Sequence, residues 1–169
     1  MDSINPNKLF RKYNKEILNY VLSRVGYRMH IAEDLTQEIF LRVVHSKESY
    51  DPHKGSVRTW LYIITKRRVI DYFRANKGIT VEFDENDLPL VTATPEKGVE
   101  TDEMLNKIKR CLAQMSEKDR ELITLRYINE LSPKEIAQIK NVSQQSLRTA
   151  LSRALTKLRK LITKLNENE

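Results

Sequence analysis

Glycine and proline are scarce in this sequence, with four and five copies among 169 residues. Sandwiches and barrels need turn-forming residues every few positions, so this scarcity disfavours both. The commonest residues are instead Lys, Leu, Glu, Ile and Arg, which suit helices. Hydrophobic residues make up 40% of the chain and charged residues 31%, as in folded soluble domains. The sequence predicts an all-α protein.

Cysteine and histidine are also rare. The single cysteine, Cys111, excludes an internal disulfide framework, and its place in a helical apolar series predicts a small core residue. The three histidines, His30, His45 and His53, lack the spacing of metal ligands, so we expect neither a metal nor another cofactor. Clustered carboxylates are missing as well, which leaves little support for an enzyme that acts on nucleic acid.

Long apolar runs are missing too. No stretch approaches the 18 residues that indicate a membrane span, and the N-terminus lacks the apolar core of a secretory signal. We therefore expect no membrane insertion of this chain and a cytoplasmic location.

Basic residues outnumber acidic residues by 30 to 23, and the two kinds are unevenly placed. Residues 1–77 contain 15 Lys and Arg against 8 Asp and Glu, and residues 101–169 contain 14 against 9. Residues 78–100 reverse the balance with 1 against 6, and they concentrate Gly, Pro, Asp and Thr. The pattern predicts two small helical domains, 1–77 and 101–169, joined by a flexible acidic linker. Two basic domains suggest a polyanion that is contacted at two places.

Apolar residues at three- and four-residue steps predict the helices within each domain. Several of the helices carry start signals, such as Asn5 before Pro6 and the capping residues Ser56 and Ser116. The predicted helices cover approximately residues 6–25, 31–45, 56–77, 104–115, 117–127, 133–140 and 144–162.

The second domain contains the sharpest local motif. Ser132, Pro133 and Glu135 predict a reciprocal capping box, and Asn141 ends the short helix with a residue that tolerates a left-handed turn. A short helix, a tight turn and a second helix with polar first turns are typical of a helix-turn-helix that reads the major groove. An ordinary helical hairpin is the alternative. The candidate DNA contacts on the second helix are Gln144, Gln145, Ser146, Arg148, Thr149, Ser152 and Arg153.

Four segments resemble the extracytoplasmic-function (ECF) group of bacterial sigma factors and occur in that family's order. They are residues 32–43 (AEDLTQEIFLRV), 58–64 (RTWLYII), 69–74 (VIDYFR) and 126–127 before the helix-turn-helix. The resemblance implies a non-catalytic protein that binds core RNA polymerase and directs promoter-specific transcription initiation. It also implies an anti-sigma factor as a further partner. Domain 1–77 would be sigma region 2, and domain 101–169 would be region 4, which recognises the minus-thirty-five element of promoter DNA.

The same resemblance assigns roles within the first domain. The helix at 32–44 is similar to the one that docks on core polymerase, with polar contacts from Glu33, Asp34, Gln37, Glu38 and Arg42. The loop before the third helix, and a basic stripe along that helix, are similar to the elements that capture and melt the minus-ten element. The candidate residues there are Tyr50, Lys54, Ser56, Arg58, Lys66, Arg67, Arg68 and Arg74.

Two further positions in the third helix bear on how it would contact DNA. Arg67 stands where many family members carry asparagine, and a guanidinium cannot accept a hydrogen bond as an amide can. Trp60 is a candidate wedge for strand opening, but it lies in step with Ile64, which favours a core tryptophan.

The linker length agrees with contact at two promoter elements. Its 23 residues reach at most about 75–80 Å at about 3.3–3.6 Å per residue, which is about two turns of duplex. The alternative function is a stand-alone helix-turn-helix regulator, which would bind duplex DNA without polymerase.

Overall fold

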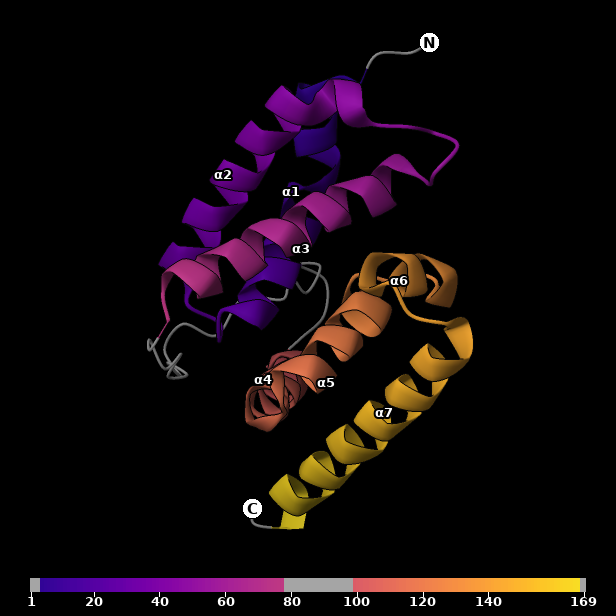
Figure 1. The fold of residues 1–169 in the computed structure, drawn as a ribbon. Coiled ribbons are helices and arrows are strands. Elements are labelled where there is room, and N and C mark those ends of the chain that lie inside the picture. Colours follow the sequence, from indigo (N-terminus) through magenta and orange to yellow (C-terminus); the bar gives the residue numbers. More distant parts are fainter. Residues whose placement is uncertain (1–3, 78–98, 168–169) are drawn as a thin grey trace.

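The computed structural model describes residues 4–77 and 99–167, and every regular element in those ranges is a helix (Figure 1). This confirms the all-α prediction. None of the helices in the described ranges is both long and apolar enough to cross a membrane. In chain order the elements are α1 (Pro6–Arg24), α2 (Met29–Ser46), the 3-10 turn η1 (Lys47–Ser49), α3 (Val57–Ala75), α4 (Val99–Gln114), α5 (Glu117–Ile123), the π-helical turn η3 (Thr124–Ile128), α6 (Pro133–Lys140) and α7 (Gln144–Glu167).

Helices α1 to α3 form the first domain, and their starts follow the sequence signals. The Asn5 side chain accepts a hydrogen bond from the Lys8 backbone N–H at 3.2 Å, and the Ser56 hydroxyl accepts one from the Thr59 N–H at 3.1 Å. These caps satisfy backbone donors that a helix start leaves unpaired. Both predicted starts are confirmed.

The first-domain core lies where α1, α2 and α3 meet. Ile17, Ile39 and Leu61 have no exposed surface, and burial of each such side chain contributes about 1.5–3 kcal/mol. The core also fixes the orientation of α2, because burial of its apolar face leaves its polar face outward.

Helices α4 to α7 form the second domain, and its first helix begins earlier than expected. Helix α4 starts at Val99, inside the segment predicted to be the linker, and the rest of that segment, residues 78–98, lies outside the described residues. Cys111 on α4 is buried as predicted, and burial raises the pKa of its thiol. The helix-turn-helix of this domain follows α5.

The predicted fifth helix changes character after Ile123. The structure replaces its last part with the π-helical turn η3, in which the Asn129 N–H donates to the Thr124 carbonyl, five residues back, at 2.8 Å. A π-turn holds one more residue than an α-turn, so it re-aims the residues that follow it. The apolar periodicity of the segment contains no signal for this turn.

The helix-turn-helix is formed by α6 and α7 as the sequence predicts. Ser132 and Glu135 make both hydrogen bonds of the capping box, and Asn141 adopts the left-handed conformation with φ of 55°. The Ser143 hydroxyl then accepts from the Ser146 N–H at 3.1 Å and caps α7. Leu147 and Leu151 are buried on the inner stripe of α7, which turns the opposite face outward.

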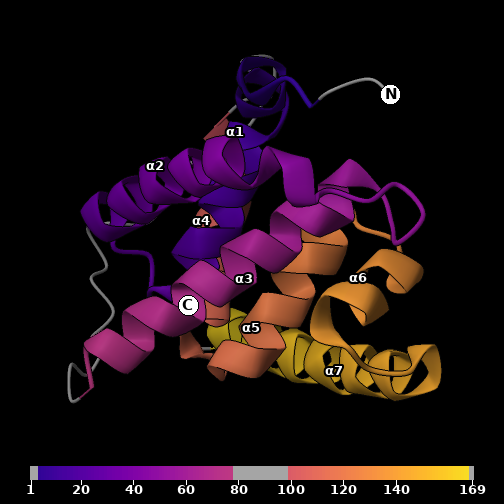
Figure 2. The same ribbon diagram turned by 45° about the horizontal axis from the view of Figure 1, so that its top comes forward.

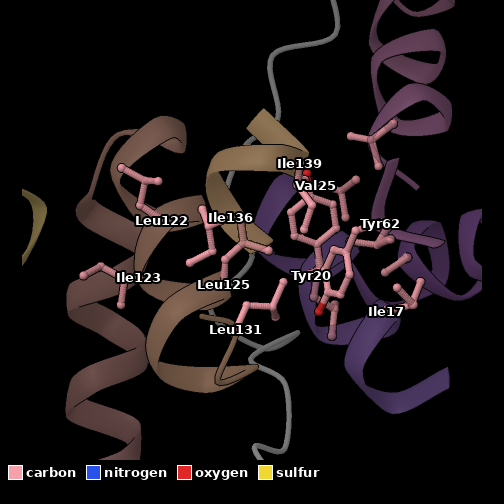
Figure 3. Close-up of a cluster of buried hydrophobic side chains, with 14 of the residues drawn as sticks. Ile17, Tyr20, Val25, Tyr62, Leu122, Ile123, Leu125, Leu131, Ile136 and Ile139 are labelled. Carbon is pink, nitrogen blue, oxygen red and sulfur yellow. The ribbon is translucent and has the colours of Figure 1, made fainter. Parts of the chain in front are cut away.

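The two domains pack against each other, with α1 and α3 facing α5 and α6 (Figures 1 and 2). One continuous cluster of buried side chains runs through both domains. In the close-up of Figure 3, Tyr20 and Tyr62 of the first domain lie with Leu131, Ile136 and Ile139 of the second. The sequence pattern predicts two domains and contains no sign of this contact.

Candidate nucleic-acid interface

The outer face of α7 carries the residues predicted to contact the minus-thirty-five element. Arg148 and Arg153 make no hydrogen bond or ion pair within the described part of the chain, and the Thr149 hydroxyl donates to the Gln145 carbonyl at 3.2 Å. The buried stripe of α7 faces α5, so the predicted residues share the open side of the helix. All seven are exposed: Gln144, Gln145, Ser146, Arg148, Thr149, Ser152 and Arg153.

The outer face of α2 carries the residues predicted to contact polymerase. The inward residues Ala32, Leu35, Ile39 and Val43 are buried. The outward set is exposed and consists of Glu33, Asp34, Gln37, Glu38 and Arg42. Two members of this set have partners on α3: Arg68 donates to Glu38 at 2.6 Å, and Arg42 donates to Asp71 at 3.0 Å. Both pairs sit at the surface, where ion pairs contribute about 0–1 kcal/mol.

An apolar patch continues the α2 face and was not predicted from the sequence. Phe10, Leu41 and Val44 are 45%, 60% and 45% exposed, and they line one shallow groove with Gln37 and Phe40. The Phe10 and Phe40 rings meet edge to face with centroids 5.0 Å apart. Leu41 lies one helical turn after Gln37, on the polar face of α2. An apolar residue on that face was the sequence signal that could have revealed the patch.

The loop before α3 is ordered by its own side chains. The Tyr50 hydroxyl donates to the Gly55 carbonyl at 3.2 Å, and its ring lies 5.5 Å from the Trp60 ring. Lys54 is exposed and lies 3.7 Å from Asp51, while Ser56 is the α3 cap described above. Trp60 is partly buried against the core, which supports the core interpretation of this residue.

The basic stripe of α3 divides into two groups. Arg67 and Arg74 are exposed, whereas Arg68 is engaged by Glu38. Arg58 and Lys66 point instead at the second domain. The Arg58 guanidinium donates to Glu16 at 2.7 Å and to the Asn129 carbonyl, and Lys66 donates to the Ile139 carbonyl at 3.2 Å. Burial and the nearby Lys140 ammonium lower the pKa of Lys66.

A buried carboxylate joins the two domains beside these residues. Glu121 of α5 accepts hydrogen bonds from the Tyr20 hydroxyl at 2.7 Å, from Arg24 at 2.9 Å and from Lys140. Burial raises the pKa of the Glu121 carboxyl, but Arg24 and Lys140 lower it more, so the net pKa lies below its ordinary value. Sequence reasoning missed Glu121, because a charged helical residue is usually on the surface.

Asn129 makes a second polar junction between the domains. Its amide donates to the Glu16 carbonyl at 2.9 Å and to the Tyr62 hydroxyl at 2.7 Å. Burial and the Glu16 carboxylate raise the pKa of Tyr62 well above its ordinary value. The π-turn η3 brings Asn129 to this position, so a feature that no local pattern predicts supplies a domain contact.

The ionisable side chains at the contact between the domains pair with one another. In residues 4–77 and 99–167 no group of three His, Cys, Asp or Glu side chains is placed to hold a metal ion. The perturbed groups Glu121, Tyr62 and Lys66 are engaged in ion pairs or hydrogen bonds with other elements. The exposed polar faces of α2 and α7 suit macromolecular partners.

Comparison with solved structures supports the fold. The sigma factor RpoE from Bartonella quintana, solved in complex with the anti-sigma factor NepR, matches with a TM-score of 0.74 at 18% identity, over 93% of this chain and 96% of that chain. CnrH, solved in complex with the cytosolic domain of CnrY, matches with a TM-score of 0.69 at 19% identity, over 94% and 88%.

Sequence comparison identifies the family. Residues 9–79 match the family model described as Sigma-70 region 2, and residues 105–158 match Sigma-70, region 4. The RNA polymerase sigma factor YlaC of Bacillus subtilis is 32% identical over 95% of this chain and 94% of its own length. The ECF RNA polymerase sigma factor SigM of the same organism is 30% identical over 92% and 93%. With both regions matched in order along one chain, the protein belongs to the ECF group of the sigma-70 family, the factors that bind core RNA polymerase and direct it to promoter DNA.

Proposed function

We propose that three surfaces of this sigma factor have separate roles in polymerase docking and promoter recognition. Helix α2 docks on core polymerase, α3 and the loop before it hold the minus-ten element, and the first turns of α7 read the minus-thirty-five element. The chain has no catalytic activity, and bond formation stays with the polymerase. The observation that carries the proposal is exposure: among the residues that the structure describes, every predicted contact residue of α2 and of α7 is exposed.

The acidic character of the α2 face indicates the chemistry of its partner. Glu33, Asp34 and Glu38 are exposed on consecutive turns of the helix, and a basic surface on core polymerase would complement them. Such charges speed association even at the rim of an interface, and they contribute more when the partner buries them.

Charge reversal on α2 tests the docking proposal. Asp34→Lys with Glu38→Lys should reduce capture of core polymerase by a tagged chain, by about 1 kcal/mol for rim charges and by several kcal/mol for buried ones. Glu103→Lys with Glu167→Lys is the matched control, because it makes the same change in net charge at exposed positions of the second domain. Circular dichroism should show unchanged helix content in both variants. Equal capture by the α2 variant and the control would refute the docking role.

A gel-shift experiment separates a sigma factor from a stand-alone regulator. Promoter DNA should shift only when core polymerase is present, because the two DNA-contacting surfaces are proposed to act together in the complex. A specific shift of duplex DNA by the chain alone, at a similar concentration, would favour the regulator.

An inhibitory partner and a cellular location follow from the same proposal. The two solved neighbours were captured in complexes with other proteins, one of them named an anti-sigma factor, and we expect this chain to bind such a factor. We also expect it to act in the cytoplasm, where bacterial polymerase and DNA are found. Co-purification with the product of an adjacent reading frame would test the first expectation, and cell fractionation would test the second.

A further inference from the structure

The outer side of α1 carries basic side chains that none of the surfaces described above includes. They recur at three- and four-residue steps, so they share one side of the helix. All of them are exposed, and within the described part of the chain none forms an ion pair or a side-chain hydrogen bond. We call this set the α1 basic row, and it consists of Lys8, Arg11, Lys12 and Lys15.

The α1 basic row concentrates positive charge without compensation. Glu16 is the only acidic residue of α1, and its carboxylate already accepts hydrogen bonds from Arg58 and Tyr62 of α3, each at 2.7 Å. The Lys12 ammonium lies 5.1 Å from the centroid of the Tyr13 ring, which leaves its charge in place. Like charges three and four residues apart destabilise a helix, so helix formation does not explain the row. An anionic partner would relieve the repulsion.

The α1 basic row lies next to the surface proposed to hold the minus-ten element. The contact of the Phe10 and Phe40 rings places the start of α1 at the end of α2, where the chain enters the loop before α3 (Figures 1 and 2). Lys12 lies one turn before Glu16 on the same side of α1, and Glu16 holds Arg58 in the first turn of α3. The row therefore runs along α1 away from the first turn of α3, so a strand held by α3 and the loop would continue onto it.

The chemistry and the length of the row both suit a nucleic-acid backbone. A shallow hollow beside it is lined by Asn5, Asn7, Lys8, Arg11 and Lys12, none of which is acidic. Their ammonium, guanidinium and amide groups donate hydrogen bonds of the kind that phosphate oxygens accept. Lys8 and Lys15 are about 10 Å apart along the axis at about 1.5 Å per residue, a length over which one DNA strand places about three phosphates.

We propose that the α1 basic row binds the sugar-phosphate backbone of promoter DNA beside the minus-ten element, through charge and without reading bases. The inference rests on the proposed function in one respect, namely that α3 and the loop before it hold the minus-ten element. It adds α1 to the DNA-binding surface of the first domain. Long basic side chains in an open hollow contact phosphates, which are the same in every sequence, so the row contributes affinity and no base preference. An acidic protein surface is the competing partner.

The salt dependence of promoter binding by the holoenzyme tests the proposal. Lys8→Gln with Lys12→Gln removes two charges from the row and keeps side chains that suit a helix. Affinity for promoter DNA should fall about tenfold near 0.1 M salt, and the slope of the logarithm of the binding constant against the logarithm of salt concentration should fall by about 1.4–1.8 units. The loss should be equal for promoters that differ in minus-ten sequence. Arg110→Gln with Lys118→Gln is the matched control, because it removes two exposed charges from the second domain, and it should leave the slope unchanged.

Neutral phosphates locate the contact on the DNA. Promoters that carry a single methylphosphonate beside the minus-ten element should bind the wild-type holoenzyme about threefold more weakly at two or three positions. The α1 variant should lose nothing further at those positions, because the interaction is already absent. Equal losses for wild type and variant at every position overturn the proposal.

An unchanged salt slope in the α1 variant also overturns it. Weaker capture of core polymerase by that variant, with the slope unchanged, would assign the row to an acidic protein surface instead. Arg67→Ala with Arg74→Ala on α3 separates this inference from the proposed function. If the α3 variant loses promoter affinity and the α1 variant does not, only the role of the row fails; if neither loses affinity, the minus-ten role of the first domain fails with it.

Discussion

The two surfaces proposed to contact DNA differ in how they relate to the rest of the chain. On α7 all seven predicted residues are exposed, and the two arginines have no partner in the described part of the chain. On α3 the stripe is divided: Arg67 and Arg74 face solvent, whereas Arg58 and Lys66 are held by the second domain. A basic side chain in a segment proposed to contact DNA can therefore already be occupied by another part of the chain.

The difference follows from how each surface is built. The open face of α7 is a local product of a helix cap and an apolar stripe, so it is complete within one domain. The face of α3 lies beside a neighbouring domain whose helix ends supply acceptors. Arg58 and Lys66 are therefore expected to contribute both to stability and to DNA binding, and the arginines of α7 to DNA binding alone.

The largest effect that separates the two surfaces should be on stability. Arg58→Ala removes contacts to Glu16 and to the Asn129 carbonyl and leaves a half-buried carboxylate with one partner fewer. We expect a loss of about 2–3 kcal/mol, less than for a fully buried pair because Arg58 stays 23% exposed. Arg148→Ala should stay within about 0.5 kcal/mol of wild type. Thermal unfolding followed by circular dichroism checks both, and equal melting temperatures for the two variants would contradict the comparison.

The next effect should be on base preference at the minus-thirty-five element. Arg148→Ala should cost about 1–3 kcal/mol of promoter binding in the polymerase complex and relax preference at one base pair, if the guanidinium is bidentate to guanine. Arg153, further along α7, is the comparison, and its alanine variant should weaken binding to all sequences alike. A library of promoter variants measured with both mutants distinguishes the roles. Unchanged upstream preferences in Arg148→Ala would show that the recognition surface lies elsewhere on the helix.

A smaller effect should appear in the pH dependence of the domain contact. Because Arg24 and Lys140 hold the pKa of Glu121 below its ordinary value of 4.5, the charged carboxylate stabilises the fold above that pH and loses this contribution as the pH falls below it. Wild type should exceed Glu121→Gln by about 1–2 kcal/mol at pH 7, and the gap should narrow between about pH 5 and pH 3. Urea unfolding at a series of pH values measures the gap. A gap that stays constant across the range would exclude the carboxylate charge as its source.

The smallest effect should distinguish two neighbours on α3. Arg67 is exposed, and Arg68 is 15% exposed and paired with Glu38. In the polymerase complex, Arg67→Ala should reduce the slope of the logarithm of the binding constant against the logarithm of salt concentration by about one unit. That change is expected for one lost phosphate contact. Arg68→Ala should change it less, since its guanidinium is already neutralised. Promoter binding measured between low and moderate salt gives both slopes, and identical slopes for the two variants would show that the Glu38 pair has no influence.

Much of each domain followed from local sequence alone. The capping box of Ser132 and Glu135, the left-handed turn at Asn141 and the helix starts at Asn5 and Ser56 were all predicted, because capping involves residues only a few positions apart. The exposed faces of α2 and α7 followed from apolar periodicity, which reports burial directly when a helix packs on one side. The role of α7 in DNA contact came from the helix-turn-helix pattern and the role of α2 in polymerase docking from family resemblance, and both remain predictions.

The domain contact was decided by tertiary structure. The Tyr20–Glu121 hydrogen bond and the contacts that occupy Arg58 and Lys66 join groups that lie 71 to 101 positions apart in the chain. A carboxylate in a helix has the same local pattern whether it meets water or two cations, so only the packing of α5 against α1 determines which occurs. The sequence by itself determined most of the helices, several of their caps and the faces that α2 and α7 expose, because these depend on neighbours within a few turns. The packing of the two domains determined which charged side chains of α3 are occupied, because Arg58 and Lys66 donate to carbonyls of the second domain.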